Sequence, residues 1–261
     1  MEGAALIRLA LFVGVLLLFA GLETLFPARA RVLPRARRWL TNLSMSALGS
    51  AVGALMAPVL AVSVAAVAAS KGWGLFNLAA LPVWLEFALS LVLLDLAVWA
   101  AHVASHRVPM LWRLHSVHHT DRDLDASSGV RFHPGEIAIS LLWKAAVIVL
   151  LGPSVLAVLV FEIVLNGTAI FTHANIALPG RLDRMVRHVF VTPDMHRIHH
   201  SVDLTESQTN YGFCLSVWDR LFRSYSDRAE GELRLGLSEH QTAAPARLWS
   251  SLALPFRRGA G

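Results

Sequence analysis

Four long apolar segments place the strongest constraint on how this chain can fold. They cover residues 4–26, 43–69, 81–104 and 137–170. A helix needs roughly 20 apolar residues to cross the hydrocarbon core of a bilayer, so each of the first three segments predicts one membrane-spanning helix. The fourth is too long for one crossing, and Gly152 and Pro153 interrupt it, which predicts a helical hairpin.

The first segment can also be read as a secretory signal peptide. Its apolar stretch is long, it lacks a clear small-residue cleavage site, and Glu23 and an arginine-rich sequence follow. We therefore expect a retained helix.

Charge is scarce, which agrees with a membrane protein. Charged residues make up 16% of the chain, whereas soluble domains carry about 25%. The net charge of +5 comes from basic residues beside the apolar segments, where anionic lipid headgroups are better partners than nucleic acid. We expect a multi-pass protein of the cell inner membrane, with membrane lipids as partners and no binding of nucleic acid.

The arginines between the first two apolar segments predict the orientation. They are Arg29, Arg31, Arg35, Arg37 and Arg38. The positive-inside rule places this loop in the cytoplasm. Counting the crossings from there puts the chain after His102 and the chain after His173 on the same cytoplasmic side. The expected fold is an all-α integral membrane protein with about four to five transmembrane or hairpin helices and a cytoplasmic helical cap that carries the histidines.

Eight histidines form three short motifs, one HxxxH and two HxxHH. They are His102, His106, His115, His118, His119, His196, His199 and His200. Positions i, i+3 and i+4 share one face of a helix, so each motif can direct its imidazoles to one point. One tetrahedral zinc ion uses four ligands, so eight imidazoles predict two ions. Imidazole suits iron, zinc, copper and nickel alike, and the single Cys214 excludes a multi-cysteine site.

These motifs resemble the three histidine boxes of the fatty acid hydroxylase superfamily, also called the sterol desaturase family. The boxes are HVASH (102–106), HSVHH (115–119) and HRIHH (196–200). The supporting stretches are Asp95 with Trp99, RFHPGE (131–136), FTHANI (171–176) and NYGFCLSVWDRLFRSY (210–225). The resemblance implies a membrane-bound non-haem oxidoreductase with two iron ions that uses O2 to hydroxylate or desaturate a C–H bond of a lipid or sterol. Zinc can substitute for iron in such a site.

The resemblance also divides the chain into three regions. Residues 1–80 are N-terminal membrane helices, and residues 81–226 are a catalytic domain like that of the family. Residues 227–261 form a polar C-terminal tail, in which residues 247–258 mix Leu, Trp and Phe with arginines and favour a short interfacial helix.

Further residues are candidates around the metal ions. His173 resembles an extra family ligand, and the alternative is a hydrogen-bonded histidine at a helix end. His133, in RFHPGE, resembles a structural or outer motif more than a ligand, whereas His188 and His240 are ordinary histidines. Metal-bound imidazoles need a partner on their second nitrogen. The candidates for that role are Asp95, Glu136, Asn166, Asp194 and Asp219, and the alternatives are helix caps, ion pairs and, for Asn166, a helix-packing hydrogen bond.

Two other function classes are alternatives to an oxygenase. A zinc hydrolase should have HExxH or a carboxylate base beside the histidines, and neither HxxHH motif supplies one. A non-catalytic metal or haem protein is the other, but haem needs paired histidines deep within the spans. The sequence has no GxGxxG nucleotide fingerprint, so we expect electrons from a separate donor protein. The substrate, and the choice between hydroxylation and desaturation, stay open.

Overall fold

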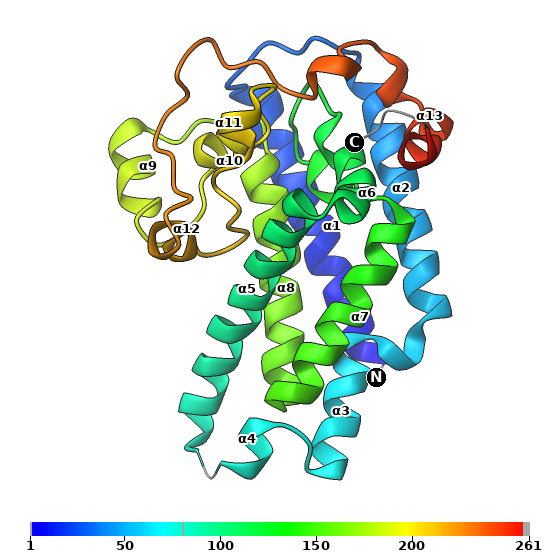
Figure 1. The fold of residues 1–261 in the computed structure, drawn as a ribbon, viewed down its shortest axis with the longest axis vertical. Helices are drawn as coiled ribbons and strands as arrows, with labels where there is room; N and C mark the ends of the chain where they lie inside the picture. The colour runs from blue at the N-terminus through cyan, green and yellow to red at the C-terminus, as the bar shows by residue number, and fades with distance from the viewer. Residues whose placement is uncertain (1, 80, 258–261) are drawn as a thin grey trace.

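A computed structural model describes residues 2–79 and 81–257, and helices are the regular elements throughout these ranges (Figure 1). The all-α prediction is therefore confirmed. Within the described residues, four helices are long and apolar enough to cross a membrane: α1 (Glu2–Leu25), α5 (Val83–Arg107), α7 (Pro134–Leu151) and α8 (Val155–His173).

Helices α7 and α8 form the predicted hairpin. Helix α7 ends where Gly152 adopts a left-handed conformation, and Pro153 follows. Ser154 then caps α8 by accepting a hydrogen bond from the backbone N–H of Ala157 at 3.3 Å. The chain reverses within three residues because glycine, proline and a capping serine follow one another.

The second predicted span, residues 43–69, is not one helix, and this prediction was wrong. Helix α2 (Arg35–Leu55) ends before a 3₁₀ turn, η1 (Ala57–Val59), and α3 (Ala61–Lys71) begins after it. Pro58 is the physical reason, because it lacks an N–H and its ring clashes with a helical carbonyl four residues earlier. The two helices still follow one another along the bundle, down to the short α4 (Leu75–Leu78) (Figure 1).

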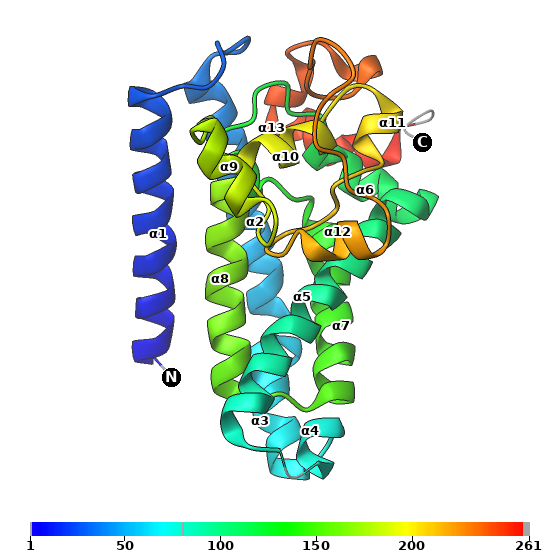
Figure 2. The same ribbon diagram turned by 90° about the vertical axis from the view of Figure 1, so that its left-hand side faces the viewer.

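The bundle core lies between α3, α5, α7 and α8. Its centre is a cluster of buried apolar side chains: Ala61, Val64, Ala65, Leu94, Ile148, Val158 and Phe161. Helix α1 stands at one side, against α8 (Figure 2). An ion pair between Arg8 and Glu162 at 2.8 Å and a Phe19–Phe171 contact join these two helices.

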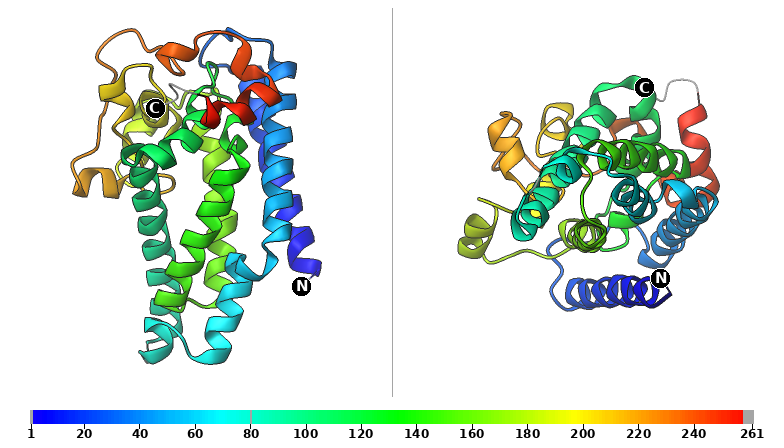
Figure 3. Two further views of the ribbon diagram at one scale, coloured as in Figure 1. Left: turned by 45° about the vertical axis from the view of Figure 1, so that its right-hand side comes forward. Right: turned by 90° about the horizontal axis from the view of Figure 1, so that it is seen from below.

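Short helices cover one end of the bundle, and we call them the cap (Figure 3). The cap consists of α6 (Pro109–His119), η2 (Ser128–Val130), α9 (Gly180–Val186), α10 (Pro193–His199), α11 (Leu204–Ser207), α12 (Val217–Leu221), η3 (Ser238–His240), η4 (Ala244–Ala246), α13 (Leu248–Ala253) and η5 (Leu254–Phe256). The arginine-rich loop lies at the same end, where the backbone N–H of Arg29 donates to Asn175 Oδ1 at 3.1 Å. Both histidine-rich regions and this loop therefore share one end of the molecule.

The predicted interfacial segment 247–258 forms α13 and η5 over its described residues. Leu248 and Leu252 pack against the buried core of Met45, Val117 and Leu254. On the other side, Trp249 is 80% exposed. The segment has an apolar outer face, and its contact with a membrane interface stays a prediction.

Candidate metal centre

The cap and the ends of α5 and α8 gather nine histidines into two adjacent groups. The first group contains His102, His106, His115, His119 and His199, and the second contains His118, His173, His196 and His200. Within each group, one nitrogen from every residue lies within 4.8 Å of the others, and every member is buried. The rings of His119 and His200 stack at 4.3 Å between centroids, which places the groups side by side.

Each histidine motif is helical, as its spacing predicts. His102 and His106 occupy the last turns of α5, and the first HxxHH motif lies on α6. Thr192 caps the N-terminus of α10, which carries His196 and His199, and His200 directly follows the helix. His173 ends α8 and belongs to the second group, so the structure brings it together with the eight motif histidines.

Three histidines of the first group have their outer nitrogens held by acceptors. Nδ1 of His102 donates to the Tyr211 carbonyl oxygen at 2.6 Å, and Nδ1 of His199 donates to the Thr209 carbonyl oxygen at 2.7 Å. Nδ1 of His115 donates to Glu136 Oε1 at 2.6 Å. A neutral imidazole has one N–H, so these bonds leave Nε2 of each ring as a bare lone pair.

The bare nitrogens face one another. Nε2 of His102 lies 3.1 Å from Nε2 of His115 and 3.1 Å from Nε2 of His199. Two lone pairs cannot form a hydrogen bond with each other, but both can bind one shared cation. Nitrogens at about 2.1 Å from one ion and at right angles to each other lie about 3 Å apart. The donor set and its spacing therefore fit a metal ion.

The second group repeats this arrangement in two of its four members, His118 and His173. Nδ1 of His173 donates to the Ala169 carbonyl oxygen at 2.7 Å, and Nδ1 of His118 donates to that of Arg131 at 3.2 Å. Their Nε2 atoms lie 3.0 Å apart, and Nε2 of His196 lies 3.0 Å from that of His173. Nε2 of His200 completes the group, 3.2 Å from that of His196.

Burial keeps the cap imidazoles neutral. It lowers the pKa of His118, His119, His196 and His200 well below the ordinary value, and neighbouring histidines lower it further. For His199, burial lowers the pKa to about 3. Neutral imidazoles are the form that binds metal ions, so the site is prepared for ligation at neutral pH.

The candidate carboxylates behave differently from one another. Glu136 contacts a histidine of the groups directly, as described for His115. Asp219 contacts Tyr211, whose carbonyl oxygen binds His102. It accepts hydrogen bonds from the backbone N–H of Tyr211 at 2.9 Å and from Trp99 at 3.0 Å. Asp95 accepts from Trp218 at 2.8 Å, and the half-exposed Asp194 pairs with the buried Arg197 at 2.8 Å. Asp194 therefore fits the alternative of an ion pair, whereas Asp95 bonds to Trp218 rather than to a histidine.

His133 and Asn166 also lie outside both groups. Nδ1 of His133 accepts a hydrogen bond from the backbone N–H of Gly135 at 3.0 Å and caps α7. Asn166 lies on α8 and lines a cavity beside the first group. His188 is exposed at the surface, as expected for an ordinary histidine.

A buried network of charges adjoins the end of the first HxxHH motif, and it was not predicted from the sequence. Arg38, which is 1% exposed, binds Asp121 Oδ1 at 2.7 Å and Asp125 Oδ2 at 2.5 Å. Burial opposes ionisation of Asp121, but Arg38 and Arg131 hold the pKa of its carboxyl below the ordinary value. Arg131 donates to the Val117 carbonyl oxygen at 3.1 Å. The network therefore fixes the end of α6, where His118 and His119 lie.

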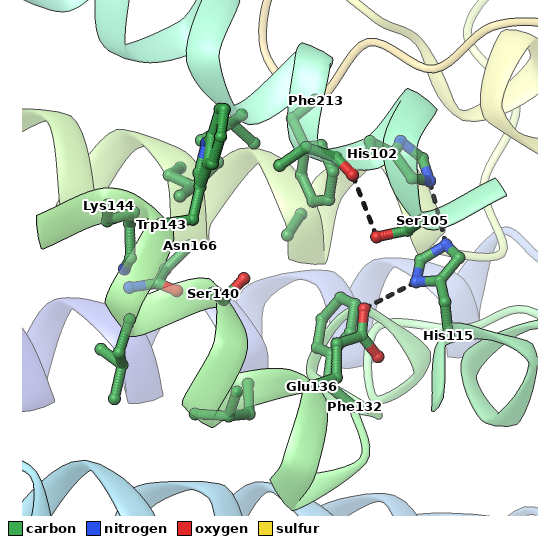
Figure 4. A pocket seen from close by; sticks show the side chains of 17 residues that line it. His102, Ser105, His115, Phe132, Glu136, Ser140, Trp143, Lys144, Asn166 and Phe213 are labelled. Atoms are coloured by element: carbon green, nitrogen blue, oxygen red, sulfur yellow. Dashed lines mark hydrogen bonds and ion pairs between the residues drawn. The ribbon is translucent and has the colours of Figure 1, made fainter. Parts of the chain in front are cut away.

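An apolar cavity of about 180 Å³ reaches the first group (Figure 4). His102, His115 and Glu136 lie at one end of it, and Lys144 and Asn166 lie at the other. The walls between them come mainly from α5, α7 and α8. Such a cavity can hold a hydrocarbon chain beside the histidines.

The family model for fatty acid hydroxylases matches residues 87–224, which include all nine histidines. The chain belongs to the fatty acid hydroxylase family. This match runs from α5 to the end of α12, so it covers the cavity and both histidine groups.

Curated relatives carry names of lipid-oxidising enzymes. The chain is 34% identical to ornithine lipid hydroxylase OlsE of Rhizobium tropici over 149 residues, which is 55% of this chain and 43% of that protein. It is 28% identical to alkylglycerol monooxygenase of Homo sapiens over 138 residues, which is 53% of this chain and 29% of that protein. The matched region thus spans less than half of either relative. No solved structure matches the chain significantly.

Proposed function

We propose that this chain is a membrane-bound lipid hydroxylase that uses two iron ions and O2. The convergence of Nε2 atoms at 3.0–3.2 Å in two adjacent buried groups carries the proposal. The names of the relatives, a hydroxylase and monooxygenases, favour oxidation of a lipid over hydrolysis. Nine imidazoles also exceed the eight ligands of two tetrahedral zinc ions, which favours iron over zinc.

In this proposal, the group of five histidines holds one ion and the group of four holds the other. Bound iron supplies the activation of O2 that oxidation of an unactivated C–H bond requires. Glu136 and the carbonyl oxygens of Tyr211, Thr209 and Ala169 fix the orientation of the rings. Burial of the groups excludes water, and the cavity holds the lipid chain beside His102 and His115.

The balanced reaction requires an external reductant. One oxygen atom of O2 enters the C–H bond as a hydroxyl, and the other leaves as water after two electrons and two protons are added. The sequence contains no GxGxxG fingerprint for a nicotinamide or flavin cofactor, so we propose that a separate donor protein supplies the electrons. We place the site on the cytoplasmic side of the cell inner membrane, from the arginine-rich loop at its end of the bundle.

Metal analysis and lipid mass spectrometry test this proposal. The purified protein, reconstituted anaerobically with ferrous iron, should contain two iron ions per chain. Lipids of a host that expresses it should include a species heavier by one oxygen atom. His115→Ala should abolish this product, whereas His188→Ala, at an exposed histidine outside both groups, should not. Binding of two zinc ions without any oxidised lipid would contradict the proposal and favour a non-oxygenase metal protein.

A further inference from the structure

A second hollow adjoins the cavity on the side of α5 and α7 that faces outward. The two spaces share five wall residues: Ala101, Ser105, Glu136, Ser140 and Trp143. The outer hollow, of about 160 Å³, is completed by Ala104, Leu111, Leu114 and Ile139. Ile139 is 40% exposed and Trp143 is 43% exposed, so this hollow reaches the surface of the bundle.

The second hollow leads into the cavity through a passage between α5 and α7. Small side chains keep this passage open. Ala101, Ala104 and Ser105 lie on one side of it, and Ser140 lies on the other. Larger side chains at these positions would fill the space between the helices. In a bundle surrounded by lipid, such a seam opens towards acyl chains rather than towards water.

Trp143 marks the deep edge of this passage. Its indole Nε1 donates to the Ala97 carbonyl oxygen at 2.9 Å, which ties α7 to α5. The bond fixes a large ring in the wall of both spaces, and Figure 4 places this ring away from the histidine end of the cavity. The passage therefore lies between Trp143 and the histidines.

The passage lies in one half of the bilayer. Helix α7 begins at Pro134, and Trp143 is nine residues further along it, which is about 14 Å at the helical rise. The hydrocarbon core is about 30 Å thick, so the passage faces the leaflet at the histidine end of the bundle.

We propose that the substrate lipid enters the cavity sideways from this leaflet, between α5 and α7, and that Trp143 sets the depth at which its chain passes. This proposal rests on the proposed lipid hydroxylase function. It assigns the small residues of the passage and Trp143 a role in substrate access, separate from the histidines that would bind metal.

Another route is less suited to an acyl chain. A smaller hollow of about 80 Å³ lies between α1 and α8 and shares only Asn166 with the cavity walls. Arg8 lines this hollow and pairs with Glu162 at 2.8 Å. A charged pair at that point opposes passage of a hydrocarbon chain.

Photolabelling in vesicles distinguishes the two routes. The iron-loaded full chain is placed in phosphatidylcholine vesicles that contain a fatty acid with a diazirine on its chain, and labelled peptides are mapped after irradiation. Phe213 lines the inner cavity and not the outer hollow, so its peptide reports entry. Ala104→Phe, which narrows only the outer hollow, should reduce labelling of that peptide at least tenfold.

Gly167→Phe is the matched control, because Gly167 lines only the hollow beside α1 and a Cβ there meets no atom within 4 Å. This variant should label the Phe213 peptide as the wild type does, and both variants should retain the same iron content. Ala104→Cys provides a second variant that changes the side chain little. Reaction with benzyl methanethiosulfonate should block labelling, and reduction should restore it, while the native Cys214 is buried.

Loss of labelling in Gly167→Phe but not in Ala104→Phe would overturn the proposal. Unchanged labelling in both variants would also overturn it, and so would a wild-type protein whose Phe213 peptide is not labelled. Labelling needs no turnover. If the protein failed to oxidise lipid but Ala104→Phe still blocked labelling, the access route would stand and the hydroxylase function would fall.

Discussion

At the scale of single residues, Glu136 links the candidate metal centre to the apolar cavity. Its Oε1 accepts from His115 Nδ1 at 2.6 Å, and the same side chain lines the cavity. A carboxylate in this position orients the ring and raises the basicity of its other nitrogen. Glu136 would therefore act on an ion held by the first group through His115 rather than by touching it.

Replacing Glu136 with glutamine tests this role. The amide keeps the shape of the side chain and one acceptor oxygen but loses the charge. We expect Glu136→Gln to weaken binding of iron to the group that contains His115 about 10- to 100-fold, measured by competition with a chelator. Asp194→Asn, which removes a carboxylate that pairs with the buried Arg197 rather than with a histidine, should bind iron like the wild type. Equal affinities for Glu136→Gln and the wild type would contradict the prediction.

The site residues differ in how well the sequence predicted them. The motif histidines were predictable because contacts at i, i+3 and i+4 are local on a helix. The Arg38–Asp121 pair joins residues 83 positions apart, and no local pattern reports such a contact. The sequence instead placed Arg38 among the arginines of the loop that predicts the orientation. Its helix begins at Arg35, earlier than the hydropathy indicated, and so turns Arg38 towards the buried aspartates.

At the scale of elements, long helices were easier to predict than short ones. Helices α5, α7 and α8 follow directly from apolar segments long enough to span a bilayer. The break at Pro58 was missed because average hydropathy does not register a single residue. Cap helices such as α11 and α12, four and five residues long, depend on tertiary contacts rather than on their own periodicity.

The turn between α7 and α8 depends on a close backbone contact with the loop before α4. Gly74 has φ of +94°, and a Cβ added there would lie 2.2 Å from the backbone nitrogen of Gly152. Asn77 Nδ2 also donates to the Gly152 carbonyl oxygen at 3.2 Å. This loop therefore supports the hairpin at the end opposite the histidines.

Substitution of Gly74 with alanine should separate these two backbones. Gly72 controls for positive φ, since its φ is +66° but a Cβ there meets no atom within 4 Å. Gly72→Ala should cost about 1–2 kcal/mol from the left-handed conformation alone. Gly74→Ala should lower the thermal unfolding midpoint in detergent at least twice as much. Equal shifts for the two variants would show that the close contact contributes nothing to stability.

At the scale of the whole molecule, polar chemistry is concentrated at one end. The histidine groups, the Arg38 network and the arginine-rich loop lie together in and beneath the cap, whereas the other end carries the turns around α4 and the α7–α8 hairpin (Figure 1). The positive-inside rule favours the orientation in which the end of the bundle with the arginine-rich loop faces the cytoplasm. The orientation of the bundle in the membrane therefore also decides on which side the histidine groups lie.

Cysteine labelling in cells tests the orientation. Ser70, near the end of α3, and Ser238, in the cap, are both exposed serines, and the native Cys214 is buried. With the cap in the cytoplasm, Ser70→Cys should react with a membrane-impermeant maleimide in intact spheroplasts. Ser238→Cys should react only after the membrane is permeabilised, because the cap and the arginine loop lie on the same side. The reverse pattern would place the histidines outside the cytoplasm and would require the donor of electrons to be sought there.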